Sequence, residues 1–211
     1  MTSNITVNTQ NSIRIAAEKI LRFDPFALPS AVHDADIIFL THDHYDHFSP
    51  EDITKAANDS TLFVAPASMA VAMKNAGIPQ ERVTYLTLDE SCELCGIKIK
   101  AVPAYNLTKS FHPKTKGWLG YVVEIGGSRV YVCGDTDDTP EARSVSCDII
   151  CVPIGGTFTC DAKSAAELVN AISPKAAIPT HYGKYVGSPA DAEVFESAVS
   201  KGIEVVRKIE F

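Results

Sequence analysis

One short segment constrains this chain more than any other: His42-Asp43-His44-Tyr45-Asp46-His47 contains three of its six histidines. The apolar run before it, residues 36–41, reads as a buried strand, and Ser49-Pro50 after it supplies the N-cap and first-turn residues of a helix. The segment is therefore expected to be a strand-to-helix loop. Residues two apart on extended backbone point to the same side, so its first two histidines should lie together. Imidazole and carboxylate groups gathered in one loop predict a site for one or two metal ions.

Composition and charge limit the other choices. The chain has 211 residues, of which 45% are hydrophobic and 21% charged, and a formal net charge of −7. These values predict a single globular domain over residues 1–211, and no apolar run reaches the roughly 18 residues that a membrane span needs. The N-terminal residues lack the pattern of a signal peptide, so we expect a cytoplasmic protein. The negative charge disfavours a nucleic-acid surface, although an enzyme that grips a single phosphodiester is less constrained by it.

The six cysteines are expected to be reduced in that compartment. Cys92 and Cys95 form a Cys-x-x-Cys pair, which a redox centre or half of a zinc site would also show. The pair precedes a strand and has no second pair nearby, so we interpret it as structural. Three others, Cys133, Cys147 and Cys151, lie in or beside apolar strands and are expected to be small buried side chains.

The alternation of apolar runs and turns predicts a layered α/β protein. Strands are expected near residues 12–24, 36–41, 61–65, 83–87, 96–103, 118–125, 129–133, 148–153, 176–180 and 203–209. Helices are expected near residues 50–57, 66–76, 161–172 and 189–200. Gly126-Gly127 lies between two of these strands and predicts a hairpin.

Polar residues follow several of the expected strands at the point where each strand ends. Asp24, Asp135, Gly155-Gly156-Thr157 and His181 all have this position. Ligand sites in α/β proteins gather outside the carboxyl ends of strands, so these residues are expected to converge on the histidine-rich loop. Alone, each would be an ordinary turn residue. Together with that loop, Asp135 and His181 are predicted to be metal ligands.

With these residues in place, the sequence resembles the metallo-β-lactamase superfamily along nearly its whole length. The loop matches the family's His-x-His-x-Asp-His motif, Gly134-Asp135-Thr136 its bridging aspartate, and Thr180-His181-Tyr182-Gly183 its last histidine. Asp24, in Phe23-Asp24-Pro25-Phe26, is similar to the family's early aspartate, which orients the metal loop. Residues 103–106, 134–137 and 179–183 look most like the branch that contains ascorbate-6-phosphate lactonase and related hydrolases.

The resemblance implies an αββα sandwich, in which two sheets have helices outside and metal ions at one edge. It also implies two divalent metal ions, for which we expect zinc, with manganese and iron as alternatives. The implied ligands of the first ion are His42 and His44, those of the second are Asp46, His47 and His181, and Asp135 lies between the two ions.

The sequence departs from the family's pattern at the third ligand of the first ion. Many members have a histidine after the strand that ends here at residues 102–105, where this chain has Asn106. His112, in the polar loop that follows, is the nearest candidate and is expected to complete the site. The alternatives are that His112 contacts the substrate or is merely exposed, and that Asn106 faces the substrate. Asp24, Asn106 and Tyr182 are accordingly predicted to support the ligands or to contact the substrate.

The expected function is hydrolysis. Metal ions of this kind lower the pKa of bound water to about 7 and so supply hydroxide at cellular pH. This hydroxide is expected to attack an electrophilic carbonyl or phosphorus, with Asp46 as the catalytic residue that holds one metal and orients the nucleophile. The substrate is expected to be a small ester or lactone, with phosphorylated metabolites among the candidates. Lys114 and Lys116 are candidates to hold an anionic group, but a solvated loop explains them equally well.

Two other functions stay open. One is a metal-dependent nuclease or phosphodiesterase, which the acidic charge weighs against. The other is a di-iron redox protein on the same fold; that class typically has a glutamate where this chain has His44 and an attached flavin-binding domain, whereas this sequence ends at Phe211. The expected partner is a small-molecule substrate, with nucleic acid and membranes disfavoured, and assembly into a homo-oligomer is left open.

Overall fold

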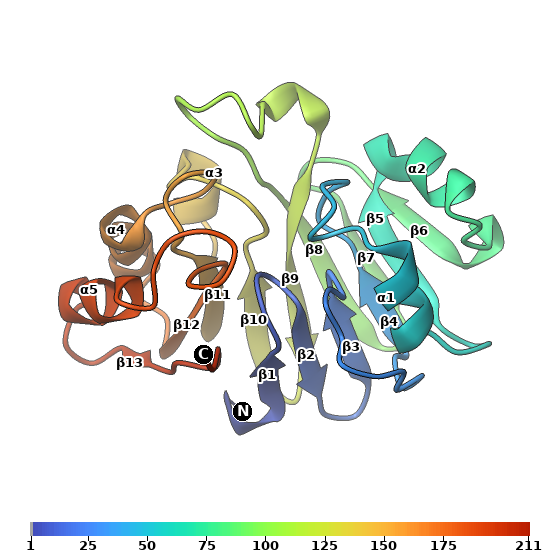
Figure 1. Cartoon of the computed structure of the whole chain (residues 1–211), viewed down its shortest axis with the longest axis horizontal. Helices are drawn as coiled ribbons and strands as arrows, with labels where there is room; N and C mark the ends of the chain where they lie inside the picture. The colour runs from blue at the N-terminus through green and yellow to red at the C-terminus, as the bar shows by residue number, and fades with distance from the viewer. Residues whose placement is uncertain (1) are drawn as a thin grey trace.

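Two β-sheets pack face to face, with helices on both outer surfaces, in the computed structural model, which describes residues 2–211 (Figure 1). The first sheet has the order β1-β2-β3-β4-β5-β6. Its strands are β1 (Ile5–Val7), β2 (Ile13–Ala16), β3 (Ile20–Phe23), β4 (Ile37–Phe39), β5 (Leu62–Pro66) and β6 (Val83–Leu86). The strands β1 to β3 are antiparallel, and β3 to β6 run parallel.

The second sheet has the order β13-β12-β11-β10-β9-β8-β7. Its strands are β7 (Ser91–Leu94), β8 (Ile97–Pro103), β9 (Leu119–Ile125), β10 (Ser128–Val132), β11 (Ile149–Pro153), β12 (Ala176–Thr180) and β13 (Glu204–Val205). The strands β7 to β10 are antiparallel, with the predicted hairpin at Gly126-Gly127, and β10 to β13 run parallel.

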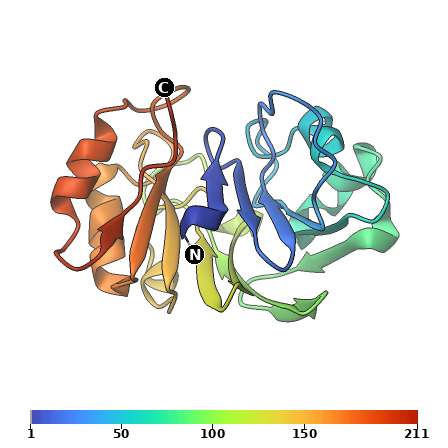
Figure 2. The same cartoon turned by 90° about the horizontal axis from the view of Figure 1, so that it is seen from below.

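The helices form the two outer layers, on opposite sides of the pair of sheets (Figure 2). The helices α1 (Pro50–Ala56) and α2 (Ala70–Asn75) cover the first sheet, where Ile53 and Met73 pack with Ile38 and Phe63. Three helices lie on the side of the second sheet: α3 (Pro140–Arg143), α4 (Ala162–Ile172) and α5 (Asp191–Ala198). This arrangement confirms the α/β class and the αββα sandwich predicted from the sequence.

The main core lies between the two sheets. Phe39 of the first sheet packs against Tyr121 of the second, with ring centroids 5.4 Å apart, and the Tyr121 hydroxyl donates to the Leu40 carbonyl at 2.7 Å. The strands β4, β11 and β12 are buried along their whole length because helices cover their outer faces. In β8, by contrast, Ile97 and Ile99 are buried and Lys98 and Lys100 are exposed, as expected for a strand whose outer face meets solvent.

The sequence-based boundaries differ from the structure in several places. Residues 12–24 form two strands, because residues 17–19 turn the chain and the Ala17 amide donates to the Lys19 carbonyl at 3.1 Å. The elements β1, β7 and α3 have no counterpart in the expectation, since they are too short or too polar to show a period. Residues 203–209 pair only at Glu204–Val205. None of the helices formed by residues 2–211 is long and apolar enough to cross a membrane.

Candidate metal centre

Loops that follow strands of both sheets bring the predicted ligands together. The histidine-rich loop joins β4 to α1, and Ser49 caps that helix by accepting from the Asp52 amide, as predicted. Three loops of the second sheet supply the rest: His112 follows β8, Asp135 follows β10 and His181 follows β12. His44 is partly exposed, and the other predicted ligands are buried, with His42, Asp46, His47, His112, Asp135 and His181 at 0–8% exposure.

The first group consists of His42, His44 and His112. Their ligand atoms lie within 4.8 Å of one another, and His42 Nε2 is 3.1 Å from His44 Nδ1. The rings pack against Trp118, whose centroid is 5.0, 4.8 and 5.4 Å from those of His42, His44 and His112. Since Trp118 is only 5% exposed, this side of the group is shielded from water.

The second group consists of Asp46, His47 and His181, also within 4.8 Å of one another. His181 Nε2 lies 3.3 Å and His47 Nε2 3.6 Å from Asp46 Oδ2. Asp135 stands between the two groups: its Oδ2 is 3.4 Å from His112 Nε2 and 3.2 Å from His181 Nε2, and its Oδ1 is 3.3 Å from His47 Nε2. Asp135 thus has the placement expected for a carboxylate shared by two ions.

These separations fit metal coordination. On a tetrahedral ion with bonds of about 2.0–2.1 Å, two ligand atoms lie about 3.3 Å apart. Within residues 2–211, the buried atoms His47 Nε2, His112 Nε2 and Asp135 Oδ1 also have no hydrogen-bond partner. Burying a polar atom without a partner costs about 1–3 kcal/mol, so such atoms call for a ligand that the protein does not itself supply. The donor set therefore fits one or two divalent ions.

Asp24 and Thr41 orient the histidines of the loop. Asp24 is fully buried and accepts from His47 Nδ1 at 2.8 Å, Asn11 Nδ2 at 2.7 Å, the Thr41 amide at 2.8 Å and Thr41 Oγ1 at 2.6 Å. Because a carboxylate only accepts, His47 carries its proton on Nδ1. Because the Thr41 hydroxyl donates its only proton to Asp24, its Oγ1 accepts from His42 Nδ1 at 3.0 Å. Both histidines therefore direct Nε2 toward the cluster, and the loss of any proton on Nε2 would leave each of them in the form that binds metal.

Asn106 orients the ring of His112, as Asp24 and Thr41 orient those of His47 and His42. Its Oδ1 accepts from both the amide and the Nδ1 of His112, at 3.0 and 3.2 Å, so the Nε2 of His112 faces Asp135. Asn106 Nδ2 donates to Asp137 Oδ1 at 3.1 Å and to the Phe158 carbonyl at 2.8 Å. The residue at the family's usual histidine position therefore lies behind His112, and His112 reaches back into the cluster.

The charges of the cluster balance one another. Burial alone would raise the pKa of Asp135 and lower those of His47 and His181, but their mutual attraction outweighs it. The pKa of Asp135 is held well below its usual range, that of His47 is raised well above it, and that of His181 rises to about 9. Burial lowers the pKa of His112 to about 4. Without metal, protons on two histidines compensate the carboxylates, and divalent ions can take the place of those protons.

Comparison with known proteins agrees with this geometry. Residues 3–182 match the β-lactamase superfamily domain. The chain belongs to the metallo-β-lactamase superfamily. A UPF0173 metal-dependent hydrolase of Thermus thermophilus is 30% identical over 203 residues, covering 93% of this chain and 88% of that protein. Another from Thermococcus onnurineus is 28% identical over 208 residues, covering 92% and 91%. A crystal structure of a protein named as a metal-dependent hydrolase from Parabacteroides distasonis has a TM-score of 0.81 at 28% identity, covering 97% and 91%.

These relatives show that this superfamily member is a metal-dependent hydrolase with a His/Asp cluster able to bind metal. The resemblance to the ascorbate-6-phosphate lactonase branch stays a prediction.

Sequence reasoning missed Gln10, which lies in the turn between β1 and β2. Its Nε2 is 3.0 Å from Asp46 Oδ2 and 3.1 Å from His181 Nε2, and its carbonyl accepts from the His181 amide at 2.9 Å. Gln10, Asp24 and His181 all have positive φ, at 48°, 43° and 55°. Strained backbone of this kind clusters at functional sites of folded proteins. That signal exists only in the structure, because no motif marks Gln10 in the sequence.

Other predicted contacts lie elsewhere. Tyr182 does not line the cavity over the cluster: it is 1% exposed in the main core, with its ring 5.5 Å from that of Phe211, so contact with the substrate is not its role. Lys114 pairs with Glu141 at 2.5 Å, and Lys116 lies over the Trp118 ring at 5.5 Å. Neither lysine lines the cavity that opens over the cluster.

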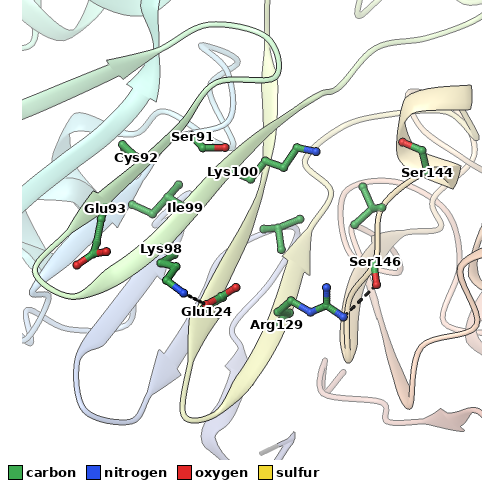
Figure 3. A pocket seen from close by; sticks show the side chains of 12 residues that line it. Ser91, Cys92, Glu93, Lys98, Ile99, Lys100, Glu124, Arg129, Ser144 and Ser146 are labelled. Carbon is green, nitrogen blue, oxygen red and sulfur yellow. Dashed lines mark hydrogen bonds and ion pairs between the residues drawn. The ribbon is translucent and has the colours of Figure 1, made fainter.

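A cavity of about 250 Å3 opens over the cluster, and five predicted ligands line it together with Gln10, namely His44, Asp46, His112, Asp135 and His181. A larger cavity of about 580 Å3 lies on the open outer face of β7 to β10 (Figure 3). There Lys98 pairs with Glu124 at 3.1 Å and Arg129 donates to Ser146 at 3.0 Å. None of the metal-type groups found in residues 2–211 reaches it, so the smaller cavity is the candidate active site.

Proposed function

We propose that the protein is a dinuclear hydrolase, with zinc as the metal, that cleaves a small ester or lactone. In this proposal His42, His44 and His112 hold one ion, Asp46, His47 and His181 hold the other, and Asp135 is shared. The observation that carries it is the pair of three-residue groups joined by one carboxylate, in which the buried atoms His47 Nε2, His112 Nε2 and Asp135 Oδ1 have no hydrogen-bond partner among residues 2–211.

When bound, such ions lower the pKa of water to about 7 and polarise the oxygen of the substrate. The chain itself supplies orientation and proton handling. Asp46 is 8% exposed and lines the cavity, so its free oxygen can accept a proton from an attacking water. Gln10 donates to Asp46 Oδ2 at 3.0 Å and so fixes which oxygen is free. Trp118 excludes water from the side of His42 and His44.

The substrate of this reaction is a carbonyl compound in our proposal, since the cavity is small. A nuclease would have to admit a polymer, and a cavity of about 250 Å3 admits only a few groups. The acidic charge of the chain, −7, points the same way. Phosphorylated substrates remain within the proposal only if the metal ions themselves hold the phosphate.

Metal content per chain, measured by elemental mass spectrometry on protein purified without a tag or chelator, tests the site. We expect two equivalents of zinc, followed by activity in a screen of lactones, esters and phosphodiesters. One equivalent would contradict the dinuclear site. Two equivalents of iron with a visible absorption band would favour a redox protein, and salt-dependent cleavage of nucleic acid would favour a nuclease.

A variant pair tests the role of Asp46. Asp46→Ala is expected to lower kcat by about 100-fold or more while the fold is kept, because both a proton acceptor and a ligand are lost. Asp43→Ala is the matched control: it is an exposed carboxylate of the same loop, outside the cluster, and should keep its activity. Equal turnover in the two variants would eliminate this mechanism.

A further inference from the structure

Aromatic side chains form much of the wall of the cavity over the cluster. Tyr45, Phe111, Phe158 and Tyr185 line it, together with Val186. They come from four separate loops: those after β4, β8, β11 and β12. Three of them are substantially exposed, with Tyr45 at 69% and Phe111 and Tyr185 at 45% each. Large apolar side chains gathered in the open at one cavity mark a binding surface for an apolar group.

The aromatic side chains are held as two pairs. On one side, the rings of Phe111 and Phe158 meet edge to face with centroids 4.7 Å apart. On the other, Phe26 contacts both Tyr45 and Tyr185, at 5.9 and 5.4 Å. The Phe111–Phe158 and Phe26–Tyr45 contacts are edge to face, and the Phe26–Tyr185 contact is tilted. Aromatic contacts of this kind contribute about 0.5–1.5 kcal/mol beyond the burial of their area, so they favour this arrangement of the walls before a ligand arrives.

Lysine and arginine are absent from the described lining of this cavity. The lysines nearby are engaged elsewhere. Lys109 donates to Asp137 at 2.6 Å and to the Thr159 carbonyl at 2.9 Å, Lys114 pairs with Glu141, and Lys184 lies over the Tyr185 ring at 5.4 Å. Apart from the metal ions and their ligand histidines, the lining therefore offers an anionic substituent no lysine or arginine to pair with, and burying a charge without such a partner is costly.

We propose that the site selects an uncharged carbonyl substrate whose ring-sized apolar group lies between the Phe111/Phe158 pair and the Tyr45/Tyr185 pair. The size agrees, because a cavity of about 150 Å3 is enough for one benzene ring, and about 250 Å3 leaves room for the reacting ester. This inference rests on the proposed function, and it narrows the substrate from any small ester or lactone to one with an apolar ring.

Three hydroxamates test the proposal on the zinc-loaded protein. Acetohydroxamate, phenylacetohydroxamate and phosphonoacetohydroxamate carry the same metal-binding group and differ only in a methyl, benzyl or phosphonomethyl substituent. Their Kd values, measured by calorimetry, report the preference of the cavity without any turnover. Burying a phenyl ring should tighten binding about tenfold to a hundredfold relative to methyl, and the phosphonate should gain less than the phenyl compound.

Variants of the aromatic side chains test whether they cause the preference for the phenyl compound. Phe111→Ala and Tyr185→Ala change half-exposed residues and should fold, and each should reduce the phenyl-to-methyl affinity ratio at least about threefold. Val71→Ala, an exposed apolar residue of α2 outside the cavity lining, should leave that ratio unchanged.

Tighter binding of the phosphonate, equal affinity for all three compounds, or a phenyl preference that survives both variants would overturn the inference. Loss of all binding would overturn the metal site and the inference together. A phenyl preference that depends on Phe111 and Tyr185, in a protein that cleaves no ester or lactone, would refute the proposed reaction and leave the assignment of the cavity intact.

Discussion

Asn106 offers a sharp test of how the first ligand group is built. Asn106→Ala removes the oxygen that accepts from the amide and Nδ1 of His112, while the backbone bond from the Asn106 amide to the His112 carbonyl, 2.8 Å, is retained. Each of these two hydrogen bonds contributes about 1 kcal/mol, so the orientation of His112 that binds metal loses about 2 kcal/mol of stabilisation. That amounts to roughly 30-fold in metal affinity, within the 10- to 100-fold range typical for partners of metal-binding histidines.

The assay is a competition titration against a chromophoric chelator that resolves two equivalents of zinc. In Asn106→Ala we expect one equivalent to weaken roughly 30-fold and the other to stay within about threefold of the wild type. His112→Ala and the double variant complete a double-mutant cycle. Because Asn106 is proposed to act through His112, the double variant should bind no more weakly than His112→Ala, and the coupling should be about 2 kcal/mol.

A matched control separates this effect from general destabilisation. Asn58→Ala removes an asparagine that also bridges backbone groups, at the His33 and Ala35 carbonyls, but lies in a loop away from the cluster. It should lower stability and leave both zinc affinities unchanged. Additive losses in the cycle would refute the reasoning, since they would mean that Asn106 contacts a metal or the substrate directly.

Three further predictions concern metal, stability and pH. Asp24→Asn replaces a carboxylate that accepts hydrogen bonds with an amide whose NH2 group would face the donors around it. It should weaken zinc binding at His47 about 10- to 100-fold in the same titration, and an unchanged affinity would contradict the orienting role of Asp24. Removing metal with a chelator should leave the circular dichroism spectrum intact and lower Tm by roughly 5–10 °C for ligand at about 100 times Kd; an unchanged Tm would argue against binding to the native state. Burial opposes ionisation of Asp52, but hydrogen bonds from Lys55 and Ser49 outweigh it and lower the Asp52 pKa. The ionised Asp52 therefore stabilises the folded protein above the unfolded pKa of about 3.9, and this stabilisation is lost as the pH falls through the lower pKa of the folded state. Asp52→Asn should therefore cost about 1–2 kcal/mol at pH 7 and much less at pH 3 in urea denaturation; an equal cost at both values would show that the charge is unimportant.

Local sequence patterns were sufficient for much of the candidate site. The loop that carries His42 and Asp46 could be predicted from a strand and a helix start that flank it, because both signals are contained in neighbouring residues. Asp135 and His181 could be placed because parallel strands of one sheet end at the same edge. The burial of Cys133, Cys147 and Cys151 confirms the prediction that they are small buried side chains.

What escaped prediction depends on contacts between distant segments. Gln10 reaches Asp46 because the turn between β1 and β2 and the loop after β4 come together at one edge of the first sheet, and no spacing in the sequence links them. The sequence favours His112 over Asn106 as the third residue of the first group but cannot show it, since the answer lies in how one loop folds back on itself. The position of Tyr182 beside His181 does not reveal that its ring packs in the main core, because that depends on contacts such as the one with Phe211.

The candidate ligands are divided between the two halves of the sandwich. The loop with His42 follows a strand of the first sheet, whereas His112, Asp135 and His181 follow strands of the second. The complete set of ligands therefore exists only where the two sheets are packed together, and we expect the sandwich to fold without the ion and to bind it afterwards. We therefore expect a cell that is short of metal to hold a reserve of folded but inactive protein, which resumes activity on resupply without new synthesis.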